Sequence, residues 1–297
     1  MRILLAISGG IDSMYLANRA GDFFPGSSFA AAHCNFNLRG SESDGDEAFV
    51  REWCRNHNLD IFVRRFDTVG YASSNGISIE MAARDLRYSW FAELCRNNGF
   101  DAVAVAHNAN DNAETLILNL LRGTGSKGLR GMSAESCQGS LKILRPMLDT
   151  GRDSISGWMT ANGMEWREDS TNGESDVKRN VIRNEVFPIF SRINPSFIRT
   201  LNRDMVHFAQ VDDIADDYYR NSGFDVRCGV DIRRLMTFSH WEYILFRLLE
   251  PYNLSIETFG KLTELLKSGR TISGKVFQSP THIVSIRRKT LSVEERN

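Results

Sequence analysis

Several features that would point to other classes of protein are scarce in these 297 residues. The five cysteines are odd in number and widely spaced, with no CxxC pair and no histidine at zinc-ligand spacing: Cys34, Cys54, Cys95, Cys137 and Cys228. This pattern argues against a disulfide framework and a metal–sulfur site. No apolar run approaches the roughly 18 residues of a membrane span, and the N-terminus lacks the pattern of a signal peptide. The sequence therefore predicts a soluble, cytoplasmic protein without a membrane partner.

Strong net charge is also lacking, since the formal total is −1. The average hides two basic segments. Between Lys178 and Arg203 six basic residues oppose one acid, and between Lys261 and Lys289 seven oppose one, for local net charges of +5 and +6. Charge counting alone favours two solvated faces, and leaves contact with a polyanion such as nucleic acid as the alternative.

Short apolar runs alternate with helical patterns over the first half of the chain. The runs cover residues 3–7, 29–32, 61–66, 102–106 and 141–144, and helices are predicted over 41–56, 79–97 and 111–121. Such alternation is typical of an α/β fold in which a parallel sheet carries helices on both faces. Ligands of these sheets bind at the carboxyl ends of the strands.

The alternation stops after about residue 165. Helices are predicted around 181–190 and 195–219, a linker follows, and two helices (232–249 and 256–266) precede a short β segment over 275–293. We therefore expect two domains, an N-terminal α/β domain with a helical extension over residues 1–217 and a smaller, mainly helical domain over 218–297.

The first strand leads directly into a glycine turn that suits phosphate binding but lacks the Gly-Lys-Ser/Thr of a Walker loop. The candidate nucleotide-binding residues are Ser8, Gly9, Gly10, Ile11, Asp12 and Ser13. Two glycines let backbone amides turn into a concavity at a helix N-terminus, and the serines add hydroxyl donors. An acid at this place repels phosphate unless a cation such as Mg²⁺ lies between them. Asp12 is thus a candidate metal ligand, and the alternative is a helix N-cap.

The loop "SGGIDS" resembles the PP-loop of the ATP pyrophosphatase superfamily, whose members cleave ATP between the α and β phosphates. Seven further motifs, in order, are similar to those of bacterial tRNA(Ile)-lysidine synthetases and extend the resemblance over residues 1–215. They read "HCNFNLRG" (33–40), "EMAARDLRY" (80–88), "AVAHNANDNAET" (104–115), "LLRGTGSKGLRGM" (120–132), "ILRPML" (143–148), "EDSTN" (168–172) and "RNVIRNEVFPIF" (179–190).

The resemblance implies a ligase that forms a C–N bond. ATP adenylates O2 of the wobble cytidine (C34) of a tRNA(Ile) with a CAU anticodon, and pyrophosphate leaves. The ε-amine of free L-lysine then displaces AMP at C2. The resemblance also implies ATP as co-substrate, Mg²⁺ and a homodimer. Because many relatives continue into a third domain, we expect this chain to be either a short form or part of a longer protein.

The lysine nucleophile demands a base, because an amine with an ordinary pKa near 10.4 is almost fully protonated at neutral pH. Removing its proton costs roughly 4 to 5 kcal/mol. The resemblance points to Asp111 for this task, with Glu114 one helical turn further on. The alternative is that both acids only favour a helix N-terminus.

Basic side chains supply the remaining candidates. Arg84, a predicted catalytic residue, and Arg87, a predicted substrate-binding residue, share a helix face and suit the lysine α-carboxylate or the α-phosphate. The alternative is a solvated basic face. His107 ends a strand, where a structural role is the alternative. The glycine-rich segment with Arg122 and Lys127 is predicted to contact ATP or the tRNA backbone, with an ordinary loop as the alternative. Arg179 and Arg183 complete the predicted substrate-binding residues.

Three other functions fit the sequence less well than lysidine synthesis. A tRNA thiolase of the same superfamily needs a sulfur carrier or an iron–sulfur cluster, for which the scattered cysteines supply no clear ligand set. A small-molecule synthetase does not need two basic segments. A noncatalytic nucleotide- or RNA-binding module does not need Asp12, Arg84 and Asp111 together.

Overall fold

The computed structural model describes residues 1–168, 177–268 and 273–296. They form two compact units, Met1–Ala209 and Gln210–Asn297. The division falls within one long helix, α10 (Phe197–Asn221), which also contains the boundary predicted near residue 218. The predicted motif over 168–172 extends beyond the described residues after Glu168, and Arg270 of the second basic segment also lies outside them.

The first unit is built on a six-stranded sheet with the order β3-β2-β1-β4-β6-β5. Five strands are parallel and β5 alone is antiparallel, paired with β6. This confirms the predicted α/β class. The strands are β1 (Arg2–Ala6), β2 (Ser28–Asn35), β3 (Ile61–Arg65), β4 (Ala102–Ala104), β5 (Glu135–Gln138) and β6 (Leu141–Leu144).

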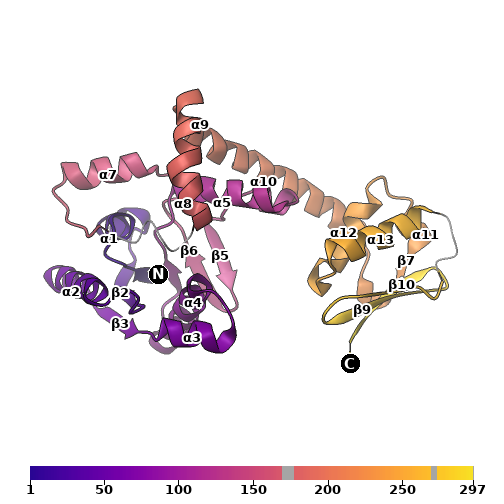
Figure 1. The fold of residues 1–297 in the computed structure, drawn as a ribbon, viewed down its shortest axis with the longest axis horizontal. Helices are drawn as coiled ribbons and strands as arrows, with labels where there is room; N and C mark the ends of the chain where they lie inside the picture. The colour runs from indigo at the N-terminus through magenta and orange to yellow at the C-terminus, as the bar shows by residue number, and fades with distance from the viewer. Residues whose placement is uncertain (169–176, 269–272, 297) are drawn as a thin grey trace. The chain divides into compact units, whose positions relative to one another are not determined.

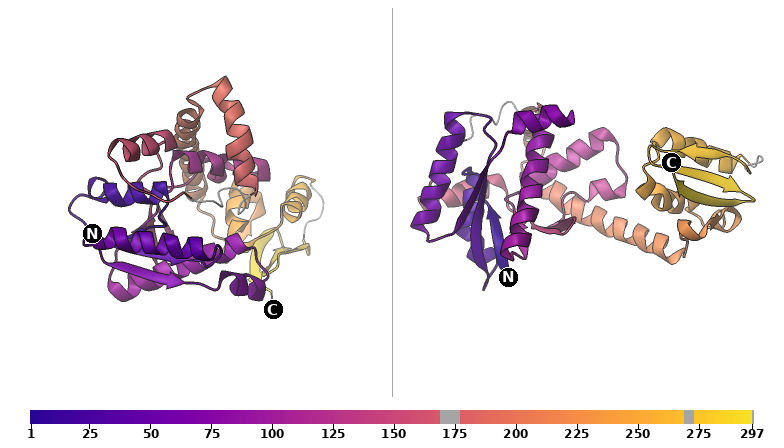
Figure 2. Two further views of the ribbon diagram at one scale, coloured as in Figure 1. Left: turned by 60° about the vertical axis from the view of Figure 1, so that its left-hand side comes forward. Right: turned by 90° about the horizontal axis from the view of Figure 1, so that it is seen from below.

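Helices cover both faces of this sheet (Figure 1). Successive residues of β1 point to opposite faces. Ile3 and Leu5 pack with α1, α2 and α7, whereas Leu4 packs with α4. The helices of the α/β part are α1 (Ile11–Phe23), α2 (Ser41–Asn56), α3 (Thr68–Asn75), α4 (Ile79–Asn98), α5 (Ala109–Arg122), α6 (Ser126–Leu129) and α7 (Arg152–Ala161). Figure 2 shows the sheet between these two helical layers.

A helical extension follows the α/β part. It comprises α8 (Val177–Val181), the π-helical turn η1 (Ile182–Val186) and α9 (Phe187–Ile193), after which α10 begins. Pro188, the second residue of α9, cannot donate a backbone hydrogen bond, and the wide turn η1 ends two residues before it. Ile182 and Phe187 pack on Ala113 and Leu118 of α5, so this extension lies against the helix that follows β4.

The second unit has its own core around a four-stranded antiparallel sheet with the order β7-β10-β9-β8. Its elements are η2 (Val226–Cys228), β7 (Val230–Asp231), α11 (Ile232–Leu235), α12 (Trp241–Leu249), η3 (Glu250–Tyr252), α13 (Ile256–Lys267), β8 (Val276–Gln278), β9 (His282–Arg287) and β10 (Thr290–Glu295). In neither unit is any described helix long and apolar enough to cross a membrane.

The strand order fixes where a ligand can bind. From β1 the chain adds β2 and β3 on one side, and later β4 and β6 on the other. The connections therefore diverge between β1 and β4, which opens a crevice at the carboxyl ends of these two strands. The predicted phosphate loop follows β1, and His107, Asp111 and Glu114 follow β4.

Candidate active site

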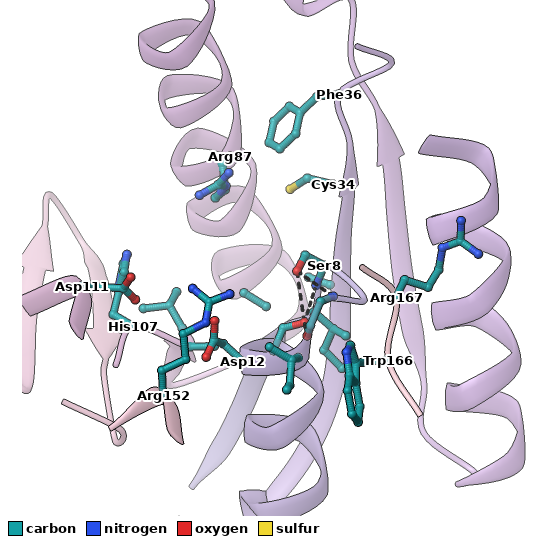
Figure 3. A pocket seen from close by; sticks show the side chains of 18 of the residues that line it. Ser8, Asp12, Cys34, Phe36, Arg87, His107, Asp111, Arg152, Trp166 and Arg167 are labelled. Atoms are coloured by element: carbon teal, nitrogen blue, oxygen red, sulfur yellow. Dashed lines mark hydrogen bonds between the residues drawn. The ribbon is translucent and has the colours of Figure 1, made fainter. Parts of the chain in front are cut away.

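A cavity of about 720 Å³ opens at this crevice (Figure 3). It is lined by residues that follow β1, β2, β4 and β6 and by residues of α4 and η1. Nine of the predicted site residues line it: Ser8, Gly10, Ile11, Asp12, Ser13, Arg87, His107, Asp111 and Arg183. Six others lie outside the lining: Gly9, Arg84, Glu114, Arg122, Lys127 and Arg179.

The phosphate loop is organised around Ser13. The Ser13 hydroxyl accepts hydrogen bonds from the backbone N–H groups of Ser8 and Gly9, both at 3.1 Å, and donates to the Gly10 carbonyl at 2.8 Å. Gly9 adopts a φ of +98°, which favours glycine. The helix α1 then begins at Ile11 without a side-chain cap within this described segment. Its first amides are therefore available to an anion.

Asp12 is not the helix cap that was the alternative prediction, because it lies inside the first turn of α1. Its carboxylate lines the cavity and accepts a hydrogen bond from the Asn108 amide at 2.9 Å. Burial, and then the charge of Asp111, raise the pKa of Asp12, while Arg152, Asn108 and Arg183 act in the opposite direction. Two neighbouring carboxylates facing one cavity are oxygen donors of the kind that Mg²⁺ prefers. The residues present therefore fit this ion.

Asn108 joins the two carboxylates. While its side chain donates to Asp12, its backbone N–H donates to Asp111 at 3.1 Å and its side-chain oxygen accepts from the N–H groups of Asn110 and Asp111. This is a reciprocal capping box at the start of α5. The cap predicted as an alternative role for Asp111 is thus present, and it orients the carboxylate toward the cavity as well.

Arg183 connects Asp111 to Glu114. Its Nε donates to Glu114 at 2.7 Å and its Nη2 donates to Asp111 at 3.2 Å. The Glu114 side chain is fully buried behind the cavity, and its second oxygen has no hydrogen-bond partner among the described residues. Burial raises the pKa of Glu114, and the Arg183 guanidinium opposes that shift. The wide turn η1 therefore places a cation between two acids of α5.

A cluster of arginines surrounds His107. Burial and the charges of Arg145, Arg87, Arg179 and Arg84 lower the pKa of His107 to about 3. The Arg84 guanidinium is exposed and lies 4.9 Å from the centroid of the Tyr88 ring, and that of Arg87 lies 5.2 Å from Phe36. The histidine is therefore neutral near pH 7, in a positive field that suits an anionic ligand.

Arg122 and Lys127 lie on the surface, the first as the last residue of α5 and the second in α6. The glycine-rich segment between and after them is fastened to the site. Asn112 of α5 accepts a hydrogen bond from the backbone of Met132 at 2.7 Å and donates to Asn202 of α10 at 2.9 Å. The segment is therefore attached to α5, and none of its residues is among those that line the cavity.

The cavity lining also includes residues that were not among the predicted site residues, although the first four lie in the quoted motifs: Cys34, Phe36, Tyr88, Glu168, Arg152, Ser156, Trp166 and Arg167. Arg167 donates its backbone N–H to the Gly9 carbonyl at 2.9 Å and its guanidinium to Asp46. Arg152 and Ser156 belong to α7, which begins after β6. One signal could have found them, since the helix that follows a parallel strand begins at the ligand-binding edge of the sheet.

Comparison with known proteins agrees with this geometry. Residues 1–190 match the family model of the PP-loop domain, and residues 225–296 match that of the TilS substrate binding domain. The fold and this match thus define a PP-loop protein. The chain is 37% identical over 295 residues to the tRNA(Ile)-lysidine synthase of Porphyromonas gingivalis strain W83, covering 98% of this chain and 63% of that protein. The chain therefore spans less than two thirds of the length of that relative, and this match, together with that to the Chlorobaculum tepidum relative, shows that it belongs to the tRNA(Ile)-lysidine synthase family.

A shorter relative and a solved structure of low sequence identity extend the comparison. The tRNA(Ile)-lysidine synthase of Chlorobaculum tepidum is 36% identical over 286 residues, which cover 91% of this chain and 85% of that protein. Among solved structures, the U34-tRNA thiolase NcsA from Methanococcus maripaludis superposes with a TM-score of 0.59 at 16% identity, covering 71% of this chain and 73% of that one. At this identity the likeness concerns the fold alone.

Proposed function

We propose that this chain ligates free L-lysine to C2 of the wobble cytidine (C34) of a tRNA(Ile) with a CAU anticodon. The reaction consumes ATP, passes through an adenylated cytidine and releases pyrophosphate and AMP. Family membership supports this function. The observation that carries it is the meeting, at one cavity, of the phosphate loop with Asp111 and Arg183.

In the first step, O2 of the cytosine attacks the α-phosphorus and pyrophosphate leaves. The first amides of α1 bind the leaving pyrophosphate, and Ser13 keeps the loop in shape. Asp12 and Asp111 would hold Mg²⁺, which when bound supplies charge neutralisation between these carboxylates and the phosphates.

In the second step, the lysine amine attacks C2 and the C2–O bond to AMP breaks. Asp111 accepts the proton that the amine must lose. Arg183 fixes the orientation of Asp111 through one hydrogen bond and is itself held by the buried Glu114. Glu114 thus acts through Arg183 in this proposal.

The arginine cluster provides anion binding for both substrates. Arg84 and Arg87 take the α-carboxylate of lysine or the α-phosphate, and His107 serves as a neutral hydrogen-bonding group. Arg122, Lys127 and Arg179 contact the tRNA backbone or ATP. The domain over 218–297 binds tRNA, in keeping with its match to a substrate-binding family model. A cytoplasmic location and a homodimer belong to the same proposal.

The direct test incubates the protein with ATP, Mg²⁺, radiolabelled lysine and a tRNA(Ile) transcript bearing CAU. Label should enter the tRNA with release of AMP and pyrophosphate in equal amounts. A transcript with GAU in place of CAU is the matched control, because it presents no cytosine at the wobble position. No transfer to correctly folded CAU transcript would refute the function, and AMP release without lysine incorporation would favour a thiolase-like use of the same adenylate.

The carboxylate roles are tested by Asp12→Asn and Asp111→Asn. Each should lower turnover by about 100-fold or more, because Asp12→Asn removes a carboxylate ligand of Mg²⁺ and Asp111→Asn removes both such a ligand and the base. Asp22→Asn is the control, since this carboxylate lies on the same helix as Asp12 but is 64% exposed. Turnover near that of the wild type in both site variants would remove these assignments.

A further inference from the structure

Arg152 is the first residue of α7 and is held firmly by its backbone. Its N–H donates to the side-chain oxygen of Asn110 at 3.0 Å. The preceding turn is fastened to the same segment, because the Ala109 N–H donates to the Thr150 carbonyl at 3.0 Å. The start of α7 is thus attached to the start of α5, which carries Asp111.

The Arg152 side chain points into the cavity, toward the carboxylate of Asp12 (Figure 3). Its charge is near enough to oppose the rise in the pKa of Asp12. No carboxylate within the described ranges lies within 4.0 Å of its guanidinium. The side chain therefore combines a fixed backbone with a guanidinium that has no ion-pair partner there.

The other arginines of the cavity have side-chain contacts, although the ring contact of Arg87 leaves its N–H donors available to an anion. Arg183 donates to Asp111 and Glu114, Arg167 donates to Asp46, and Arg87 lies over the Phe36 ring. Arg152 is the lining arginine next to Asp12 whose donors are not engaged by a side chain of the described residues. A planar guanidinium in this position can give two parallel hydrogen bonds to a phosphate.

We propose that Arg152 is a catalytic residue whose guanidinium binds the non-bridging oxygens of the α-phosphate of ATP. The inference rests on the proposed function and deepens it. Arg152 lies across Asp12 from the phosphate loop, on the side of His107 and Asp111 (Figure 3). In the proposed function the backbone amides of the phosphate loop bind the pyrophosphate. The Arg152 guanidinium, on the other side of Asp12, therefore faces the α-phosphorus, where the reaction takes place.

The chemistry requires a cation there without proton transfer. When O2 of cytosine forms its bond to the α-phosphorus, the bond from that phosphorus to the bridging oxygen breaks and its electron pair leaves with pyrophosphate. Negative charge on the non-bridging oxygens faces Arg152 throughout, and the guanidinium keeps its protons. In the second step the same phosphate leaves as AMP, with its charge again held by Arg152.

Asn110 is a positioning residue in this scheme. The Gly151 cap of α7 has no side chain, and Asn110 accepts the first N–H of that helix instead. Removing the Asn110 amide frees the residue that carries the guanidinium, without touching any substrate. Its effect on turnover should therefore pass through Arg152.

The test measures Mg-ATP binding, single-turnover pyrophosphate release and lysine incorporation for Arg152→Gln, Arg152→Lys and Asn110→Ala. We expect Arg152→Gln to slow pyrophosphate release by about 100-fold or more, as for other lost transition-state donors, while the Kd for Mg-ATP changes less than about threefold. Arg152→Lys should recover part of the rate because it restores the charge. Arg55→Gln is the matched control, since Arg55 is 75% exposed on α2.

A double variant distinguishes a positioning role of Asn110, which acts through Arg152, from general support of the fold. Asn110→Ala alone should slow pyrophosphate release by about tenfold, and the double variant with Arg152→Gln should be no slower than Arg152→Gln alone. If the double variant instead lost rate by the product of the two single losses, the positioning role of Asn110 would be overturned.

Thermal unfolding by circular dichroism shows whether each variant is folded. Wild-type rates in Arg152→Gln, or slowing fully explained by weaker ATP binding, would overturn the inference while wild-type protein still makes lysidine. If wild-type protein makes none, the proposed function itself fails. In that case the measurement of pyrophosphate release from bound ATP still tests the inference. Equal release by the wild-type protein and by Arg152→Gln would overturn it.

Discussion

Replacing Arg183 with methionine should destabilise the first unit by about 3 kcal/mol at neutral pH. The substitution keeps an unbranched, flexible stem but removes the guanidinium that pairs with the fully buried carboxylate of Glu114. Breaking a buried ion pair from one side costs about 3–5 kcal/mol, because the remaining charge loses its compensation. We take the lower end, since Arg183 is 29% exposed and water partly solvates the site.

The pH dependence gives this prediction a second readout. Burial raises the pKa of Glu114, and loss of Arg183 raises it further. A carboxyl whose native pKa lies above its unfolded value stabilises the fold at low pH, and this contribution disappears as the pH rises through the native pKa. The deficit of Arg183→Met should therefore be larger at pH 8 than at pH 5. Glu114→Gln in the same chain should recover at least half of it.

The assay is urea unfolding followed by tryptophan fluorescence. Four of the five tryptophans lie in the first unit, Trp53, Trp90, Trp158 and Trp166, so the signal reports chiefly on the unit that carries the pair. Arg55→Met removes an exposed ion pair with Glu52 and should cost less than about 1 kcal/mol. A loss in Arg183→Met no larger than in Arg55→Met, or no recovery in the double variant, would refute the reasoning.

Three further predictions address the loop, the histidine and the tRNA. Gly9→Ala should lower the free energy of unfolding by about 1–2 kcal/mol and weaken ATP binding, because the φ of +98° at Gly9 disfavours a side chain. Gly21→Ala, in open space on α1, should instead raise the free energy of unfolding by about 1 kcal/mol. Equal urea midpoints for the two variants would contradict this prediction. Because native His107 has a pKa of about 3, it excludes a proton that the unfolded chain binds, so stability falls as the pH drops below about 6.5. His107→Gln should flatten the dependence of Tm on pH in that range, and parallel curves would disprove it. The affinity for tRNA, measured by filter binding, should fall steeply with salt as phosphates release counterions, and a flat response would leave the basic segments as solvated surface.

The sequence alone determined the parts of this protein that are local. Five of the six strands of the first sheet coincide with apolar runs from which strands were predicted. The phosphate loop lies within six consecutive residues, Ser8–Ser13. Local periodicity and turn chemistry are sufficient for such features, because their physical causes act over a few residues. The edge strand β5 was not predicted, since its sequence Glu135–Gln138 is polar and mostly exposed.

Only the tertiary structure decided which side chains meet. Arg183 lies 69 residues from Glu114 and 72 from Asp111, and Arg152 lies 42 from Asn110. These contacts depend on the placement of β4 between β1 and β6 and on the extension that packs against α5. No local pattern encodes that order, because it results from how whole strands and helices bury their apolar faces together. The sequence therefore supplied the phosphate loop and the acids, and the fold set Arg152 beside Asp12 and Arg183 between Asp111 and Glu114.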